Sequence, residues 1–184
     1  MILGSAIRRA ARQALVAGEV VAYPTEAVWG LGCDPRNETA LRRVLTLKQR
    51  DPAKGLIVVA SHIDQLEALI IIPSRAAYRR ARLSWPGPNT WVFPAGPQAS
   101  PWLTGAHDTL AVRVSAHPVV RALCEAWGGP LVSTSANRAG QPPATSRTQV
   151  QLRFPGTLVV PGALGSLARP TPIREAATGH YLRQ

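Results

Sequence analysis

The stretch NETALRRVLTLKQRDPAKGLIVVA, residues 37–60, contains the two patterns that decide the fold. Its first half predicts a helix, because Asn37 can cap the first turn and Glu38 suits the positive end of the helix dipole. An apolar stripe then follows one helical face through Leu41, Val44, Leu45 and Leu47. Residues 55–60 are continuously apolar and rich in β-branched side chains, which is typical of a buried strand. A helix that leads into a buried strand indicates the α/β class.

Helices and strands are expected to alternate along the rest of the chain. Helices are expected over residues 5–18, 38–50, 63–70, 74–83 and 118–127, with Ser5 as the first N-cap and Gly128–Gly129 ending the last. Strands are expected at 19–23, 90–94, 109–115, 130–134 and 157–160, and residues 173–184 should form a hairpin that turns at Thr178–Gly179. We find no internal repeat and no linker in the sequence. Residues 1–184 are therefore predicted to form a single α/β domain with a mixed sheet.

The composition indicates a globular protein with an anionic ligand. Of the 184 residues, 46% are hydrophobic and 17% are charged, and the formal net charge is +11. Such an excess of cations favours a nucleotide or nucleic acid as ligand, although a surface rich in arginine for solubility would give the same number. Cys33 and Cys124 are too few for a disulfide framework, and the longest apolar run, residues 68–72, is too short to cross a membrane. We find no signal peptide, and we expect a cytoplasmic protein that does not bind membranes.

Several common catalytic and binding motifs are missing from the sequence. It contains no G-x-x-x-x-G-K-[ST] phosphate loop, and STSAN at 133–137 is not the G-x-S-x-G turn of a serine hydrolase. The four histidines share no metal-ligand spacing and have no neighbouring cluster of cysteines or carboxylates. No metal is therefore expected to be held by the protein itself.

Lys48 and Arg50 stand at the end of the helix predicted in the opening stretch. Lys48 and Lys54 are the only lysines in the chain, and all its other Lys or Arg positions are arginines. A compact ammonium beside a forked guanidinium suits contacts to phosphate oxygens. The alternative is that both cations complement the negative end of the helix dipole. We expect Lys54 to be a solvated turn residue.

Three further segments place polar side chains within or directly after apolar strands. LVSTSAN, residues 131–137, ends in hydroxyls and an amide that could bind an anion or could form a turn. YPTEAVWGLG, residues 23–32, brings Thr25 and Glu26 directly after a strand, with two glycines that allow close backbone approach. Arg113 interrupts the apolar strand AVRV and must point to solvent or be paired, for which the carboxylate of a ligand is a natural partner.

Together these segments resemble the YrdC family of threonylcarbamoyl-AMP synthases. The matching motifs occur in the family's order, and the likeness extends from about residue 5 to the C-terminus. They are YPTEAVWGLGCDP, LKQRDPAKGLIVVA, WPGPNTWVFPA, TLAVRVSAHP and PLVSTSANRAGQPP. The length resembles the short, single-domain bacterial form. The resemblance implies an open, twisted α/β sheet around a large, positively charged cavity.

The resemblance also implies roles for individual residues. Lys48 and Arg50 would bind the ATP phosphates and supply the electrostatic catalysis. The ATP-binding set would be completed by Thr109, Ser135, Asn137 and Arg183. The positions that hold L-threonine in the family correspond to Thr25, Arg113, Ser133 and Thr171.

The implied reaction joins L-threonine, bicarbonate or carbon dioxide, and ATP into threonylcarbamoyl-AMP and pyrophosphate, for N6-threonylcarbamoyladenosine in tRNA. Mg²⁺ would arrive with ATP, and the product would pass to a threonylcarbamoyl-transfer complex. Direct contact with tRNA or double-stranded RNA is a further expectation. Two alternatives remain open at this point: an RNA-binding module of tRNA or ribosome maturation without catalysis, and a carbamoyl-adenylate activity like that of the related hydrogenase-maturation domain.

Overall fold

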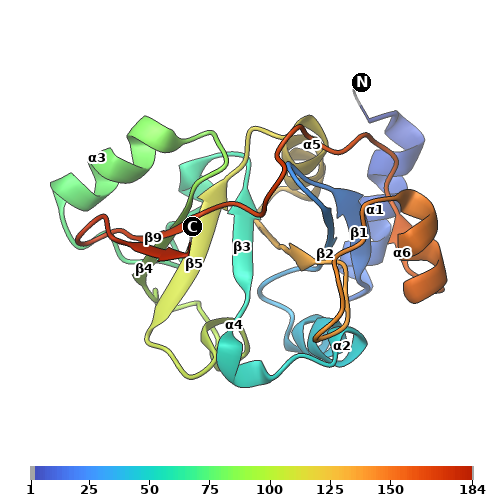
Figure 1. The fold of residues 1–184 in the computed structure, drawn as a ribbon, viewed down its shortest axis with the longest axis horizontal. Coiled ribbons are helices and arrows are strands. Elements are labelled where there is room, and N and C mark those ends of the chain that lie inside the picture. Colours follow the sequence, from blue (N-terminus) through green and yellow to red (C-terminus); the bar gives the residue numbers. More distant parts are fainter. Residues whose placement is uncertain (1–2, 184) are drawn as a thin grey trace.

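The computed structural model describes residues 3–183, and its elements alternate much as the sequence predicts (Figure 1). The helices are α1 (Ser5–Val16), α2 (Glu38–Lys48), α3 (Arg75–Ser84), α4 (Pro101–Thr104), α5 (Pro118–Trp127) and α6 (Arg147–Arg153), with short 3₁₀ helices η1 (Pro52–Lys54) and η2 (Ile63–Leu66). The longer strands are β1 (Val21–Pro24), β2 (Trp29–Gly32), β3 (Ile57–Ala60), β4 (Thr90–Pro94) and β5 (Thr109–Val114). The shorter ones are β6 (Leu131–Val132), β7 (Thr134–Ser135), β8 (Leu158–Val159), β9 (Ile173–Glu175) and β10 (Tyr181–Arg183).

The strands form two open sheets, each with mixed strand directions. One sheet has the order β10-β9-β4-β5-β3-β6, and the other has the order β7-β2-β1-β8. Within the first, β3 pairs with β5 and β4 with β9 in parallel, whereas β4 and β5 are antiparallel. The predicted α/β class with an open, mixed sheet is confirmed, and the strands are divided between two sheets.

The strand expected at residues 130–134 shows how the chain passes between these sheets. Ser133 interrupts it, so that β6 pairs with β3 in the six-stranded sheet and β7 pairs with β2 in the other. The backbone N–H of Ser133 donates a hydrogen bond to the carbonyl of Ile57 at 2.8 Å. The interruption therefore places a short polar side chain where the two sheets adjoin.

Local signals in the sequence account for most helix ends. The Asn37 side chain accepts a hydrogen bond from the backbone N–H of Ala40 at 3.0 Å, so the predicted cap of α2 is confirmed. Gly128 ends α5 in the left-handed conformation, as expected. Ser5 was wrongly predicted as a cap: Gly4 has the extended conformation of an N-cap, and the helix begins at Ser5 itself. The helix expected at 63–70 is the short 3₁₀ helix η2.

Two groups of buried side chains hold the elements together. The larger includes Trp91, Phe93 and Leu41 and joins α2 and α3 to strands of both sheets, and the smaller joins α1 and α5 to β1 through Leu15 and Leu123. Among residues 3–183, no helix is long and apolar enough to cross a membrane. After β8 the chain crosses the molecule, from the end near α6 to the β9–β10 hairpin beside α3 (Figure 1). This crossing segment, residues 161–172, passes over the junction of the sheets.

Candidate functional site

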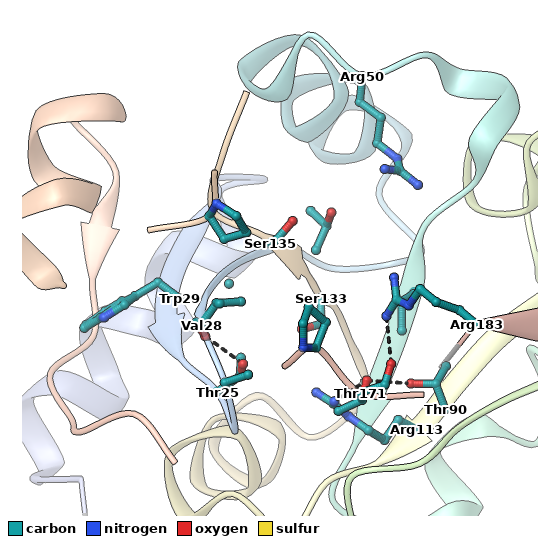
Figure 2. Close-up of a pocket in the computed structure, with 16 residues that line it drawn as sticks. Thr25, Val28, Trp29, Arg50, Thr90, Arg113, Ser133, Ser135, Thr171 and Arg183 are labelled. Carbon is teal, nitrogen blue, oxygen red and sulfur yellow. Dashed lines mark hydrogen bonds between the residues drawn. The ribbon is translucent and has the colours of Figure 1, made fainter. Parts of the chain in front are cut away.

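A cleft opens at the junction of the two sheets, and we call it the inter-sheet cleft (Figure 2). Its walls include the β1–β2 connection, the break between β6 and β7, strand β5 and the end of the crossing segment. Most of the site residues predicted from the sequence line it: Thr25, Arg50, Arg113, Ser133, Ser135, Thr171 and Arg183. Segments that are far apart in the sequence thus bring their polar side chains into one space.

A second cleft, which we call the hairpin cleft, adjoins the first. It is lined by the β9–β10 hairpin, β4, β5 and the turn around η1, and it contains Thr109. Arg50, Ile57 and Arg183 line both clefts, so the two guanidinium groups stand between them. Apolar side chains such as Val92, Leu103 and Leu182 line much of the hairpin cleft. One cleft is thus rich in hydroxyls and the other has apolar walls, with cations between them.

Hydroxyl groups face the inter-sheet cleft from both sides (Figure 2). On one side, Thr25 donates a hydrogen bond from its hydroxyl to the carbonyl of Val28 at 2.7 Å. On the other, the hydroxyls of Thr90 and Thr171 are 3.2 Å apart, and Nη1 of Arg113 donates to the Thr171 hydroxyl at 3.1 Å. These contacts hold the donors and acceptors of the cleft in place before any ligand binds.

Arg113 is buried with a carboxylate partner that belongs to the protein. Its side chain is 7% exposed, and Nη2 lies 3.1 Å from Oε2 of Glu26, whose side chain is 11% exposed. The prediction that Arg113 must point to solvent or be paired is confirmed, but its partner Glu26 was missed. The sequence offered one signal for this pair: the carboxylate of Glu26 follows an apolar strand, and the guanidinium of Arg113 interrupts another. Their pairing could not be read from spacing, because 87 positions separate them.

Arg50 is half-buried and Arg183 is exposed, and backbone oxygens hold both cations. Arg50 donates from Nε to the carbonyl of Gly55 at 3.0 Å, and Arg183 donates from Nη2 to the carbonyl of Thr171 at 2.8 Å. Burial lowers the pKa of Arg50 and of Arg183 from the usual value for arginine. The positive charge of Arg113 further lowers the pKa of Arg183. Like charges this close to one another favour an anionic ligand between them.

Lys48 and Asn137 lie behind the cleft wall, and neither is among the described residues that line the two clefts. The ammonium of Lys48 donates to the carbonyl of Ser135, to the carbonyl of Asn137 at 2.9 Å and to Oδ1 of Asn137 at 3.3 Å. Burial, with a smaller effect of the Arg50 charge, lowers the pKa of Lys48 to about 8. Ser135 donates to Oδ1 of Asn137 at 2.5 Å. In this structure Lys48 therefore braces the loop that carries Ser135.

The charge of the two clefts determines the kind of ligand they can accept. Arginines line both, and no Asp or Glu is among the described residues that line either. Residues 3–183 also contain no cluster of three or more His, Cys, Asp or Glu side chains that could hold a metal ion. The arrangement can hold a polyanion and a small polar molecule side by side, and it can stabilise negative charge that develops between them.

The fold and this site define an α/β protein with an arginine-lined cleft between two open sheets, and comparisons with known proteins identify its family. The model of the Sua5/YciO/YrdC family, which carries the description "Telomere recombination", matches residues 13–183. A protein of Stenotrophomonas maltophilia called threonylcarbamoyl-AMP synthase is 56% identical over 92% of this chain and 93% of its own length. The chain belongs to the Sua5/YciO/YrdC family.

Solved structures show the same fold. The crystal structure of P. abyssi Sua5 complexed with L-threonine has a TM-score of 0.85 and 33% identity over 92% of this chain. The match covers 50% of the length of that Sua5 chain. The structure of E. coli YciO has a TM-score of 0.84 at 22% identity, over 97% of this chain and 88% of its own. The predicted family resemblance is confirmed.

Proposed function

We propose that this protein is a threonylcarbamoyl-AMP synthase. It joins L-threonine, bicarbonate or carbon dioxide, and ATP into L-threonylcarbamoyl-AMP and pyrophosphate, for the N6-threonylcarbamoyladenosine at position 37 of tRNA. The observation that carries this conclusion is the 56% identity, over nearly the full length of both chains, to a protein of that name. The chemistry of the two clefts agrees with it, since one is lined by hydroxyls and an arginine and the other adjoins a group of cations.

The inter-sheet cleft is the proposed site for L-threonine. Arg113 would bind the carboxylate of the amino acid, and the hydroxyls of Thr25, Ser133 and Thr171 would bind its remaining polar groups. All four residues line this cleft. A relative with this fold has been crystallised with L-threonine, which supports an amino-acid site in the family.

The ATP would lie along the cations between the two clefts. Arg50 and Arg183 would bind its phosphates, with Thr109 in the hairpin cleft and Ser135 at the border of the other. Lys48 and Asn137 would act on ATP through the loop that holds Ser135, and the Lys48 ammonium would add its positive charge from behind this loop.

The chemistry requires alignment and charge, and it uses no covalent enzyme nucleophile. The threonine amine and bicarbonate would form a carbamate with release of one water. A carbamate oxygen would then attack the α-phosphorus in line, the bond to the bridging oxygen would break, and pyrophosphate would leave with that electron pair. Arg50 and Lys48 would stabilise the negative charge that develops on the leaving group. Mg²⁺ finds no carboxylate among the described cleft-lining residues, so it would enter as part of the Mg·ATP substrate, held by phosphates and water.

The proposed partners beyond the substrates are a threonylcarbamoyl-transfer complex that receives the product, and tRNA or double-stranded RNA. We predict a cytoplasmic location for this reaction sequence. A pure RNA-binding module would need neither threonine nor bicarbonate, and this difference separates the two functions.

The direct test is a mass spectrum of the reaction mixture, with pyrophosphate release measured in parallel. We expect threonylcarbamoyl-AMP and pyrophosphate to appear only when L-threonine, bicarbonate and ATP are all present. Omitting threonine is the control for ATP hydrolysis by contaminants. Release of pyrophosphate that does not depend on threonine, or a product that forms only with carbamoyl phosphate, would contradict the proposal.

A further inference from the structure

A chain of buried polar side chains lies beneath the inter-sheet cleft. Ser115 donates from its hydroxyl to Oε1 of Glu26 at 2.6 Å, and Oε2 of Glu26 lies 3.1 Å from Nη2 of Arg113. Arg113 in turn donates from Nη1 to the hydroxyl of Thr171 at 3.1 Å. Each of these four residues is at most 9% exposed. The chain connects Glu26, which is not among the described residues that line the cleft, to Arg113, which is.

Glu26 joins parts of the molecule that are distant in the sequence. It lies in the connection between β1 and β2 of one sheet, whereas Arg113 lies in β5 of the other. Its backbone carbonyl accepts a hydrogen bond from the N–H of Leu167, in the crossing segment, at 3.0 Å. Both sheets and the segment that passes over the cleft are therefore held at this one residue, the sheets through its carboxylate and the segment through its backbone carbonyl.

The contacts of Arg113 leave it able to bind a second anion. Its guanidinium has five N–H donors, and one hydrogen bond to Thr171 and one ion pair with Glu26 use part of them. Nε of Arg113 and Oε2 of Glu26 are both buried without a hydrogen-bond partner among residues 3–183, so the contact between Nη2 and Oε2 is an ion pair. A buried donor without a partner is costly unless a ligand supplies one. Glu26 itself is not among the described residues that line the cleft, so its influence on a ligand would pass through Arg113.

We propose that Glu26 is a positioning residue, which holds the Arg113 guanidinium in the orientation that receives the carboxylate of the amino-acid substrate. This inference rests on the proposed function, because it takes the inter-sheet cleft as the amino-acid site. Without the Glu26 charge, the guanidinium loses its fixed partner at Nη2 and can turn away from the substrate. Binding of the carboxylate should weaken, whereas binding of ATP, which is assigned to other residues, should not.

The test uses Glu26→Gln, which keeps the length and the acceptor for Ser115 but removes the charge. Affinities for L-threonine and for L-threoninamide, which lacks the carboxylate, are measured by isothermal titration calorimetry. We expect the wild-type protein to prefer L-threonine, and we expect Glu26→Gln to weaken L-threonine binding by about 10- to 100-fold. The variant should bind L-threoninamide and ATP as the wild type does. A general loss of structure would instead weaken the binding of L-threonine, L-threoninamide and ATP together.

Two further variants make the result decisive. Glu19→Gln removes a surface ion pair with Arg43 and is the matched control, which should leave the preference for L-threonine unchanged. In an Arg113→Ala background, Glu26→Gln should have no further effect on this preference, because the residue through which it acts is gone. An equal penalty in both backgrounds, or an unchanged preference in Glu26→Gln itself, would overturn the proposal.

Ser115→Ala covers the case in which Glu26→Gln does not fold. It leaves both charges in place and removes the hydroxyl that donates to Oε1 of Glu26 and that accepts a hydrogen bond from the backbone N–H of His117. The preference for L-threonine over L-threoninamide should fall in this variant too, and an unchanged preference would then overturn the proposal. Failure of the wild-type protein to form threonylcarbamoyl-AMP would defeat the proposed function instead, and this is measured separately by the mass spectrum.

Discussion

Lys48 and Arg50 are two positions apart, yet they have different surroundings. Gln49 ends α2 in the left-handed conformation with φ of 51°, so the chain turns between them. Arg50 then reaches both clefts, whereas the Lys48 ammonium contacts three oxygens of residues 135 and 137. A compact ammonium can donate to several oxygens in a tight loop, and a larger planar guanidinium cannot do so in the same space. This gives a physical reason for one of the two lysines in an arginine-rich chain.

The lowered pKa of Lys48 predicts a pH dependence of ATP binding. As the pH rises through about 8, the folded protein loses this positive charge and the donors that brace the Ser135 loop. ATP affinity should therefore fall with rising pH between about 7 and 9, by on the order of tenfold, since a hydrogen bond to a charged group contributes about 1.5–3 kcal/mol. Equilibrium dialysis of ATP without threonine and bicarbonate measures this, because the titration of those substrates does not interfere.

Arginine substitutions serve as controls for this pH dependence. Lys48→Arg keeps its charge throughout this range, so the fall in ATP affinity near pH 8 should disappear, even if the variant binds ATP less tightly. Lys54→Arg changes the other, exposed lysine and should keep the fall. An unchanged fall in Lys48→Arg would show that another group titrates.

At the scale of elements, the C-terminal hairpin carries Arg183 into the site. Strands β9 and β10 are antiparallel as predicted, and β9 adds to the edge of β4. The Arg174 guanidinium lies 4.8 Å from the centre of the Trp91 ring and 4.6 Å from that of Tyr181, which holds the hairpin on the sheet. From α3, Nη1 of Arg80 donates to the carbonyls of Ala176 and Ala177 at 3.0 and 2.7 Å. Helix α3 therefore helps to set the position of Arg183, which lies in β10.

Removing the contact between α3 and the hairpin should weaken ATP binding. Arg80→Ala deletes both hydrogen bonds to the turn, so the hairpin and Arg183 become less ordered. We expect the KM for ATP to rise about three- to tenfold, which corresponds to roughly one net hydrogen bond. Amide hydrogen exchange should also become faster in residues 173–183. Arg79→Ala, at an exposed neighbour on the same helix, is the control, and equal effects of the two variants would contradict this role.

At the scale of the whole molecule, the site depends on how closely the two sheets approach. The backbone N–H of Val132 donates to the carbonyl of Cys33 at 2.9 Å, and the Tyr23 hydroxyl donates to the carbonyl of Val132 at 2.8 Å. A Cβ at Gly32 would lie 2.3 Å from that same carbonyl oxygen. Gly32, one of the two glycines predicted to allow close backbone approach, does so here. Arg50, Arg113 and Arg183 line the cleft into which this junction opens.

Gly32→Ala should therefore destabilise the fold. The added methyl group meets backbone that cannot move without separating the sheets, and overpacking of this kind costs about 1–3 kcal/mol. Urea denaturation should show a lower free energy of unfolding with an unchanged m-value. Gly129→Ala is the control, because its Cβ would meet the flexible end of Arg36 at 3.4 Å. Equal stability of the wild type and Gly32→Ala would contradict the proposed close approach.

Local patterns in the sequence predict most of the longer elements of this protein and the residue types of its site, whereas β2, α4 and α6 were not predicted. Asn37 caps α2 because a short polar side chain before an apolar stripe is a local signal, and GLIVVA forms β3 because its apolar run needs burial on both faces. Most of the candidate site residues could also be chosen from the sequence, since each is a polar group at the end or in the middle of an apolar segment. Such signals depend on a few neighbouring positions, and they are readable before the chain folds.

Only the tertiary structure decided how these elements and residues meet. In the folded protein the strands are divided between two sheets at Ser133. Arg113 is paired with Glu26, and Lys48 contacts the loop of Ser135 and Asn137. Lys48 and Ser135 are 87 positions apart in the sequence, and so are Glu26 and Arg113. The burial of one charge requires another at the same place in space, and the packing of the sheets, rather than spacing along the chain, determines which partner is there.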